Sequence, residues 1–318
     1  MYTKSVNEFI RVRLEQTPNN TQIARDVKNK FSSIYKDKEL EAIRKYVSKT
    51  RERLQIEAKN VPIRRLFFDI ETSYYELRVK TFSLRNYQRY YNHNDIEKDS
   101  KVICISYKWQ YEDEVHTLDW RMGEKKMLKA FIKILGGSDE AIGHNGDNFD
   151  LKYLRMRCIA NGVLMFPTYR TLDTLKKARS GFRFASNKLD YLGKFFGVGG
   201  KEDNPGFEMW EDVVDGNVEM LEKMISYCER DVILLEDVYF ILSPFITHNN
   251  NFSVLTGGKK FFCPECASED VIMHKTYSTP MGIIRRNMKC SSCKKQYKIS
   301  NKDYLAWLRY QVNGNEVE

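Results

Sequence analysis

The chain has 318 residues, of which 42% are hydrophobic and 30% are charged, and its formal net charge is +9. This length predicts two or three domains, and the composition is that of a globular protein rather than a disordered or collagen-like one. No apolar run approaches the ~20 residues of a membrane-spanning helix, and the polar N-terminus lacks the apolar segment of a signal peptide. We therefore expect a cytoplasmic protein in a prokaryotic or phage-like context, without membrane contact, whose seven cysteines are thiols or metal ligands.

Positive charge is concentrated at both ends of the chain. Residues 1–60 contain 14 Lys and Arg against 8 Asp and Glu, and residues 258–318 contain 11 against 6, which leaves the middle at −2. Two basic ends around a core that gathers carboxylates fit a protein that holds nucleic acid by its ends. Lysines that only keep the ends soluble would give the same counts.

Residues 1–60 are predicted to form a basic helical domain. A short helix stops near Pro18, a second follows from about Asn20, and a longer basic helix begins near Asp37. A short helix, a tight break and a basic helix are typical of a DNA-binding helix-turn-helix. A basic helical hairpin packed against the rest of the protein is the alternative.

Residues 61–247 show strands first and then strands alternating with helices, which predicts an α/β fold, a mixed sheet flanked by helices. The expected strands cover 63–71, 101–109, 114–120 and 140–145, and the expected helices cover 124–135, 149–160, 189–196 and 221–242.

Acidic side chains recur at special places in this region. Asp69 and Glu71 lie two apart on an apolar strand, so both project from one face and repel each other unless a cation or a proton compensates. Asp150 opens a helix directly after a strand. Tyr227 and Asp231 are four apart on an apolar helix and therefore share one of its faces.

In this order, the segments FFDIET, NGDNFD and YCERD resemble the three motifs of DnaQ-like 3′→5′ exonucleases. The resemblance covers about residues 62–245 and is greatest to the exonuclease domains of family B DNA polymerases. Ser226 stands where one branch of the superfamily has a histidine, whereas Tyr227 matches the tyrosine (DEDDy) branch.

The resemblance implies an RNase H-like fold and two Mg²⁺ or Mn²⁺ ions that act together on a phosphodiester. It implies that Tyr227 orients the attacking water and that Thr72 and Asn145 contact the substrate. His144 is interpreted as structural, because a single histidine beside a motif usually is. The implied ligands of the two ions are carboxylates, namely Asp69, Glu71, Asp150 and Asp231.

Two C-x-x-C pairs near the C-terminal end are separated by 23 residues that read as two strands and a turn. This pattern predicts a zinc ribbon over 257–300, with one structural Zn²⁺, followed by a C-terminal tail over 301–318. A redox dithiol is the rival interpretation, and the ribbon suits either nucleic acid or a protein partner. The predicted zinc ligands are the cysteines of the two pairs, Cys263, Cys266, Cys290 and Cys293. The remaining cysteines, Cys104, Cys158 and Cys228, are interpreted as inert core thiols.

The leading hypothesis is a metal-dependent 3′→5′ exonuclease acting on DNA, single-stranded DNA in particular, in preference to RNA. An RNA 3′-end exonuclease is the nearest alternative because the same active site serves both substrates. A non-catalytic DNA-binding regulator that uses the nuclease fold as a platform is the third.

Overall fold

The computed structural model describes residues 4–16, 20–32, 42–47, 49–50, 63–80, 91–110, 112–200, 206–247 and 250–313. The chain divides into two compact units. One is Arg64–Thr247, and the other combines Met1–Ile63 with His248–Glu318.

A five-stranded mixed sheet forms the centre of the Arg64–Thr247 unit, in the order β5-β4-β1-β6-β7. The central strand β1 pairs antiparallel with β4 on one side and parallel with β6 on the other. The strands are β1 (Arg65–Thr72), β4 (Val102–Trp109), β5 (His116–Asp119), β6 (Glu140–Gly143) and β7 (Thr171–Asp173). The predicted mixed α/β sheet is therefore confirmed.

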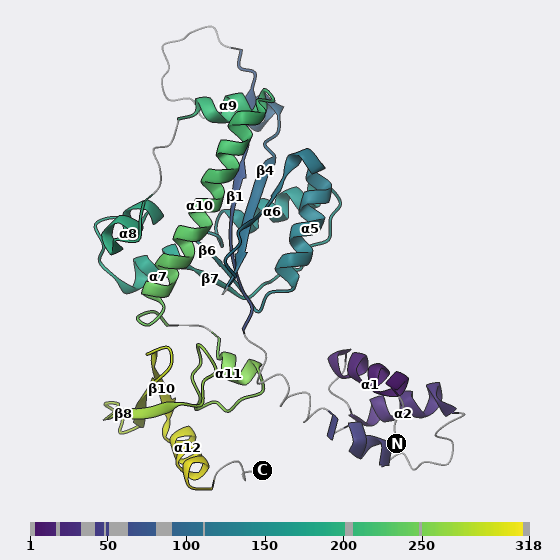
Figure 1. Ribbon diagram of the computed structural model, residues 1–318, viewed down its shortest axis with the longest axis vertical. Helices are drawn as coiled ribbons and strands as arrows, with labels where there is room; N and C mark the ends of the chain where they lie inside the picture. The colour runs from purple at the N-terminus through teal and green to yellow at the C-terminus, as the bar shows by residue number, and fades with distance from the viewer. Residues whose placement is uncertain are drawn as a thin grey trace. The chain divides into compact units, whose positions relative to one another are not determined.

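Helices cover both faces of this sheet, and the alternation of side chains along β1 decides which face each one covers (Figure 1). Leu66, Phe68 and Ile70 share one buried cluster with α5 (Glu124–Gly136) and α6 (Asp150–Ala160). Phe67 points the other way, into a cluster with the remaining helices of the core. Those helices are α7 (Thr174–Gly181), α8 (Leu189–Phe196) and α10 (Val218–Leu242). The 25-residue helix α10 thus lies over β1 and β4 on the face to which Phe67 points.

Short elements complete the unit. They are β2 (Glu76–Leu77), β3 (Ile96–Lys98), α9 (Glu208–Val214) and the 3₁₀ turns His93–Asp95 and Trp120–Met122.

The N-terminal residues form helices with a shared core. Helix α1 (Lys4–Gln16) and helix α2 (Asn20–Lys30) are followed by helical residues 42–47. Arg13 pairs with Asp26 between α1 and α2. The buried side chains come from all three segments: Val6, Ile10, Ile23, Ala24, Val27, Ile43 and Val47. The expected start of the third helix near Asp37 lies outside the described residues.

The C-terminal residues form a three-stranded antiparallel sheet in the order β10-β9-β8. Its elements are α11 (Phe252–Leu255), β8 (Val271–Ser278), β9 (Ile284–Cys290), β10 (Gln296–Ser300) and α12 (Asn301–Asn313). Residues 301–313 are thus helical, whereas a C-terminal tail was expected over 301–318. Tyr304, Trp307 and Tyr310 recur every three residues on α12 and pack against the cluster around Phe261 and Phe262.

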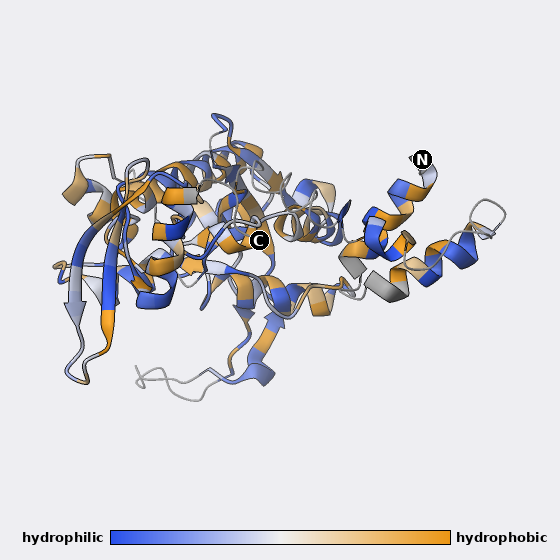
Figure 2. Ribbon diagram, turned by 90° about the horizontal axis from the view of Figure 1, so that it is seen from below, coloured by the Kyte–Doolittle hydropathy of each residue, from blue (hydrophilic) through white to orange (hydrophobic). Residues whose placement is uncertain are grey.

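Orange and blue segments alternate along the helices near the N-terminus in Figure 2, as expected for helices with one buried face. None of the described helices combines the length and the apolar character that crossing a lipid bilayer requires.

The sheet and α10 are joined by an ion pair between Lys108 of β4 and Glu236, whose side chains are only 10% and 11% exposed. Replacing Glu236 by Gln leaves the Lys108 ammonium buried without its counter-charge. We expect this change to lower the free energy of unfolding by about 3 kcal/mol, measured by urea denaturation with tryptophan fluorescence. Glu219→Gln, which breaks the exposed pair with Lys223 on the same helix, should cost no more than about 0.5 kcal/mol. Equal losses in the two variants would contradict the expectation.

Candidate functional site

Strand β1 carries Asp69 and Glu71 on the face of the sheet that α10 covers. The residues between and before them, Ile70 and Phe68, are buried in the opposite cluster, so the pleat directs both acids away from it. Both acids are half-buried. Within the sheet, Asp69 lies opposite Ser106 and Glu71 lies opposite Cys104 of β4.

Helix α10 brings further side chains to the same place. The Sγ atom of Cys228 lies 3.6 Å from the carbonyl oxygen and 3.8 Å from the Oδ2 atom of Asp69. One ligand atom from each of Asp69, Glu71 and Cys228 falls within 4.8 Å of the other two. One turn later, Asp231 is buried and lines the same pocket as Asp69. Tyr227, four residues before Asp231, is half-buried.

Asp150, the first residue of α6, approaches β1 from its β6 side. Its carboxyl group lies close to the backbone of Ile70, the residue between the two acids of β1. Asp150 is 3% exposed, and its Oδ1 atom has no hydrogen-bond partner. Burial, with a smaller contribution from the charge of Asp173, raises the pKa of Asp150 to about 7. A buried carboxylate oxygen without a donor is an unusual feature and calls for a cation or a proton.

A tight loop after β6 sets the position of Asp150. Gly143 and Gly146 approach so closely that a Cβ atom on Gly143 would lie 3.0 Å from the Cα of Gly146. Between them, Asn145 has a left-handed backbone with φ of 74°. A side chain at either glycine would press against the backbone of the other, so both positions favour glycine, and the loop leads directly into α6.

Asp173, at the end of β7, holds this loop. Its carboxylate accepts hydrogen bonds from the backbone N–H groups of Asn145 (3.0 Å), Asp147 (3.4 Å) and Lys176 (3.2 Å). One buried carboxylate therefore caps α7 and fixes the loop before Asp150.

His144 is held by the protein through both ring nitrogens. Nδ1 lies 2.9 Å from the hydroxyl of Thr174, and Nε2 lies 2.9 Å from the carbonyl oxygen of Asn187. Both distances fit the structural role that the sequence analysis favours for this residue.

Thr72 ends β1 at an irregularity, because the register with β4 shifts between Glu71 and Thr72. Its carbonyl oxygen accepts a hydrogen bond of 3.1 Å from the indole N–H of Trp210 in α9. The end of the strand is thereby attached to the helix that precedes α10.

A pocket of about 530 Å³ opens over these acids. Asp69, Asp231 and His144 line it on the side of β1, β6 and α10, whereas Arg179 and Lys188 line it from α7 and the segment before α8. Asp190 of α8 also lines the pocket, next to Lys188 and Leu189, and pairs with Lys194. The cations Arg179 and Lys188 suit a ligand that carries phosphate. Of the predicted site residues, Asp69 and Asp231 line this pocket.

Cys228 is buried in an apolar cluster, in agreement with the predicted core thiol, and its sulfur also lies against Asp69. Burial, followed by its interaction with Cys104, raises the pKa of the Cys228 thiol well above its ordinary value, which keeps it neutral. Asp173 has no motif of its own, and its position directly before a helix was the available signal for a cap.

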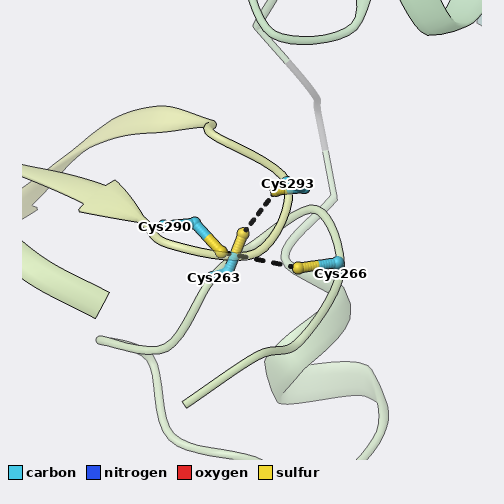
Figure 3. A group of neighbouring side chains, drawn as sticks. All are labelled: Cys263, Cys266, Cys290 and Cys293. Atoms are coloured by element: carbon cyan, nitrogen blue, oxygen red, sulfur yellow. Dashed lines mark hydrogen bonds between the residues drawn. The ribbon is translucent and has the colours of Figure 1, made fainter. Parts of the chain in front are cut away.

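The four C-terminal cysteines converge, as Figure 3 shows. The Sγ atoms of Cys263 and Cys293 are 3.5 Å apart, and those of Cys266 and Cys290 are 3.7 Å apart. All four lie within 4.8 Å of one another. This cluster of thiols has the composition of a tetrahedral zinc site.

The two C-x-x-C segments have matching backbones. The residue after each second cysteine, Ala267 or Lys294, adopts a left-handed conformation, with φ of 57° and 64°. The N–H of Ala267 donates to the carbonyl oxygen of Cys263 at 3.0 Å. Each pair is thus folded into a compact turn that points both thiols inward, as a Cys₄ ion site needs.

Comparison with known proteins agrees with this architecture. Residues 93–243 match the RNase_H superfamily (RNase_H_2), a segment that contains Asp150, Tyr227 and Asp231 but begins after β1. A DNA polymerase of Thermococcus hydrothermalis is 30% identical over 122 residues, which are 35% of this chain and 7% of that protein. A DNA polymerase of Thermococcus sp. (strain 9oN-7) is 32% identical over 130 residues, which are 38% of this chain and 14% of that protein.

A solved structure, the family B DNA polymerase from the hyperthermophilic archaeon Pyrobaculum calidifontis, aligns with 58% of this chain and 25% of its own. The identity is 20% and the TM-score is 0.41. The chain spans only a small part of the polymerases that it matches. It contains an RNase H-like domain, and the predicted RNase H-like fold is confirmed.

Asp173→Ala should remove the acceptor shared by three backbone N–H groups. We expect it to lower the free energy of unfolding by about 2–4 kcal/mol, and to speed hydrogen exchange at the amides of Asn145 and Lys176. Asp147→Asn, which alters a partly exposed side chain paired with Lys176, serves as the control in the same loop and should change stability by less than about 1 kcal/mol. Unchanged exchange at both amides in Asp173→Ala would show that the cap does not hold the loop.

Proposed function

We propose that the Arg64–Thr247 unit is a divalent-metal-dependent 3′→5′ exonuclease of the DEDDy type. One arrangement carries the proposal: Asp69 and Glu71 stand side by side on β1, and Asp69 shares its pocket with Asp231. Like charges so close together in a partly buried site are stabilised by a cation. The similarity of part of the chain to DNA polymerases supports DNA as the substrate. Single-stranded DNA is the form that we propose.

The donor set fits Mg²⁺ or Mn²⁺, because both ions prefer carboxylate oxygens. Asp69, Glu71 and Asp231 would hold one ion, Asp69 would also reach a second, and Asp150 would act on the second through water. The buried Oδ1 of Asp150, which has no donor from the protein, supports this part. When bound, the two ions would activate a water molecule and stabilise the charge that develops at the phosphodiester.

The other residues of the site would position the reactants. Tyr227 would orient the attacking water through its hydroxyl, since an ordinary phenol with a pKa of ~10 is a weak base at neutral pH. Thr72 and Asn145 would contact the terminal nucleotide. Arg179 and Lys188, which line the same pocket as Asp69 and Asp231, would attract its phosphate.

Asp69→Ala is expected to reduce the Mg²⁺-dependent shortening of a 5′-labelled single-stranded oligonucleotide roughly a hundredfold or more, while DNA binding survives. Asp231→Ala should behave alike. The measurement is the rate at which a ladder of shorter products appears on a denaturing gel. The control is Glu219→Gln, an exposed acid of α10, which should cleave at the wild-type rate.

The polarity and the substrate are tested together. An oligonucleotide whose 3′-terminal linkages are phosphorothioates should resist shortening, and duplex DNA and RNA of the same sequence are compared with single-stranded DNA. Wild-type protein that shortens none of these with Mg²⁺ or Mn²⁺ would refute the catalytic proposal. Faster digestion of RNA would replace DNA by RNA as the substrate.

We also propose that the cysteine cluster holds one structural Zn²⁺ within a ribbon over 257–300, and that this ribbon and the helices of 1–60 help to hold nucleic acid. Four thiolate ligands leave no open position for chemistry.

Elemental analysis should find about one zinc per chain, because a Cys₄ site binds a single ion. Cys290→Ser should lose this zinc and expose the aromatic core near Trp307, which is read out by fluorescence. Cys158→Ser, in a buried thiol of α6, should retain the zinc. A zinc content far below one per chain in wild-type protein would exclude the ribbon.

A further inference from the structure

A second cavity of about 1110 Å³ lies on the Arg64–Thr247 unit, between the start of β4 and the first turns of α5. We call it the basic groove. Six of its twelve lining residues are Lys or Arg, and Glu124 is the one acid among them. This density of positive charge contrasts with the net charge of −2 in the middle of the sequence.

The one acid and the two arginines of the groove form ion pairs, either with each other or with residues outside the groove. Arg157 donates to both carboxylate oxygens of Glu124, at 2.8 and 2.7 Å. Arg121 is bound to Asp119 and to Glu222 outside the groove. These pairs fix the walls and contribute little net charge.

The four lysines of the groove behave differently. Lys101 precedes β4, and the other three occupy the first turns of α5; all four are exposed. Among the described residues, none of the four has an ion pair with a carboxylate. They are Lys101, Lys125, Lys126 and Lys129. Four exposed ammonium groups repel one another, so an anion that neutralises several of them at once is favoured.

The groove adjoins the end of β1. Val102 lines it and is the β4 partner of Thr72. The N–H of Ser73 donates to the carbonyl oxygen of Lys101 at 2.8 Å, and the N–H of Lys101 donates to the Ser73 hydroxyl. Lys101 therefore lies one residue beyond the strand that carries Asp69 and Glu71, whereas the other three lysines are on α5, which packs on the opposite face of the sheet from these acids.

We propose that the basic groove binds the phosphodiester backbone of a nucleic-acid strand whose 3′ end is held at the acidic site, an inference that rests on the proposed function. Lys125 and Lys129 are one helical turn apart, about 6 Å along the axis. They can therefore pair with successive phosphates rather than converge on one. Trp120, which lines the groove, adds an aromatic surface of the kind on which bases stack.

The closing experiment compares two charge-matched double variants of the full chain. Lys125→Ala with Lys129→Ala removes two groove lysines. Lys133→Ala with Lys152→Ala removes two exposed lysines, one on the next turn of α5 and one on α6, that do not line the groove. Binding of a fluorescent 20-nucleotide single strand is measured by anisotropy in EDTA at several salt concentrations. Hydrolysis of the 20-mer and of thymidine 5′-p-nitrophenyl phosphate is measured with Mn²⁺.

The groove variant should bind the 20-mer about tenfold more weakly, and the slope of log affinity against log salt should fall by about 1.4, the effect of two phosphate contacts on a single strand. Its kcat/KM should fall on the 20-mer and stay at the wild-type value on the small ester, which cannot reach the groove. The control variant should match wild type in affinity and slope.

Equal binding by the two double variants, whether weakened or not, would overturn the inference, because charge outside the groove would then act as well. Because binding is measured in EDTA, this outcome does not depend on catalysis. Wild-type protein that hydrolyses neither substrate would instead refute the proposed function. The two failures are therefore distinguishable.

Discussion

Two carboxylates on one face of a central strand constrain the whole Arg64–Thr247 unit. Asp69 and Glu71 interrupt an apolar strand that is paired on both sides and covered by α10, so they cannot both turn to open solvent. The fold surrounds them with further polar groups from α10 and α6, while Phe67 and its neighbours carry the packing. Without a cation, burial of these carboxylates and the repulsion between them lower the stability of the folded state. Binding of a cation would therefore stabilise the fold as well as supply the chemistry.

The periodic spacing of apolar residues predicted those helices and strands of the unit in which apolar and polar residues alternate regularly. The strand before Glu71 and the helices over 124–135 and 189–196 agree with the structure to within about two residues, because each repeats one apolar spacing. The short strand β7 and the helix α7 that follows it were not predicted. Three residues are too few to show a period, and β7 exists because β6 pairs with it.

Residues of the candidate site could be predicted where they belong to a sequence motif. Features that depend on tertiary contacts could not be predicted. Asp150 could be placed at a helix start, but its orphaned Oδ1 and its contact with Ile70 arise only from the packing of α6 against β1. The distribution of charge along the sequence predicted that the basic ends of the chain bind nucleic acid. Net charge summed over long segments does not detect the basic groove, because its lysines come from Lys101 and from a helix that starts 23 residues later.

The aromatic face of α12 has a consequence for the order of events during synthesis. Trp307 and Tyr310 pack against a cluster that includes Cys263 and Cys290, so the core around the thiols is complete only after α12 has joined it. Chains emerge from the ribosome N-terminus first, at about 5–20 residues per second. The four thiols are therefore synthesised roughly a second before the helix that covers them. Oxidants in that interval would meet cysteines whose protecting core is not yet complete.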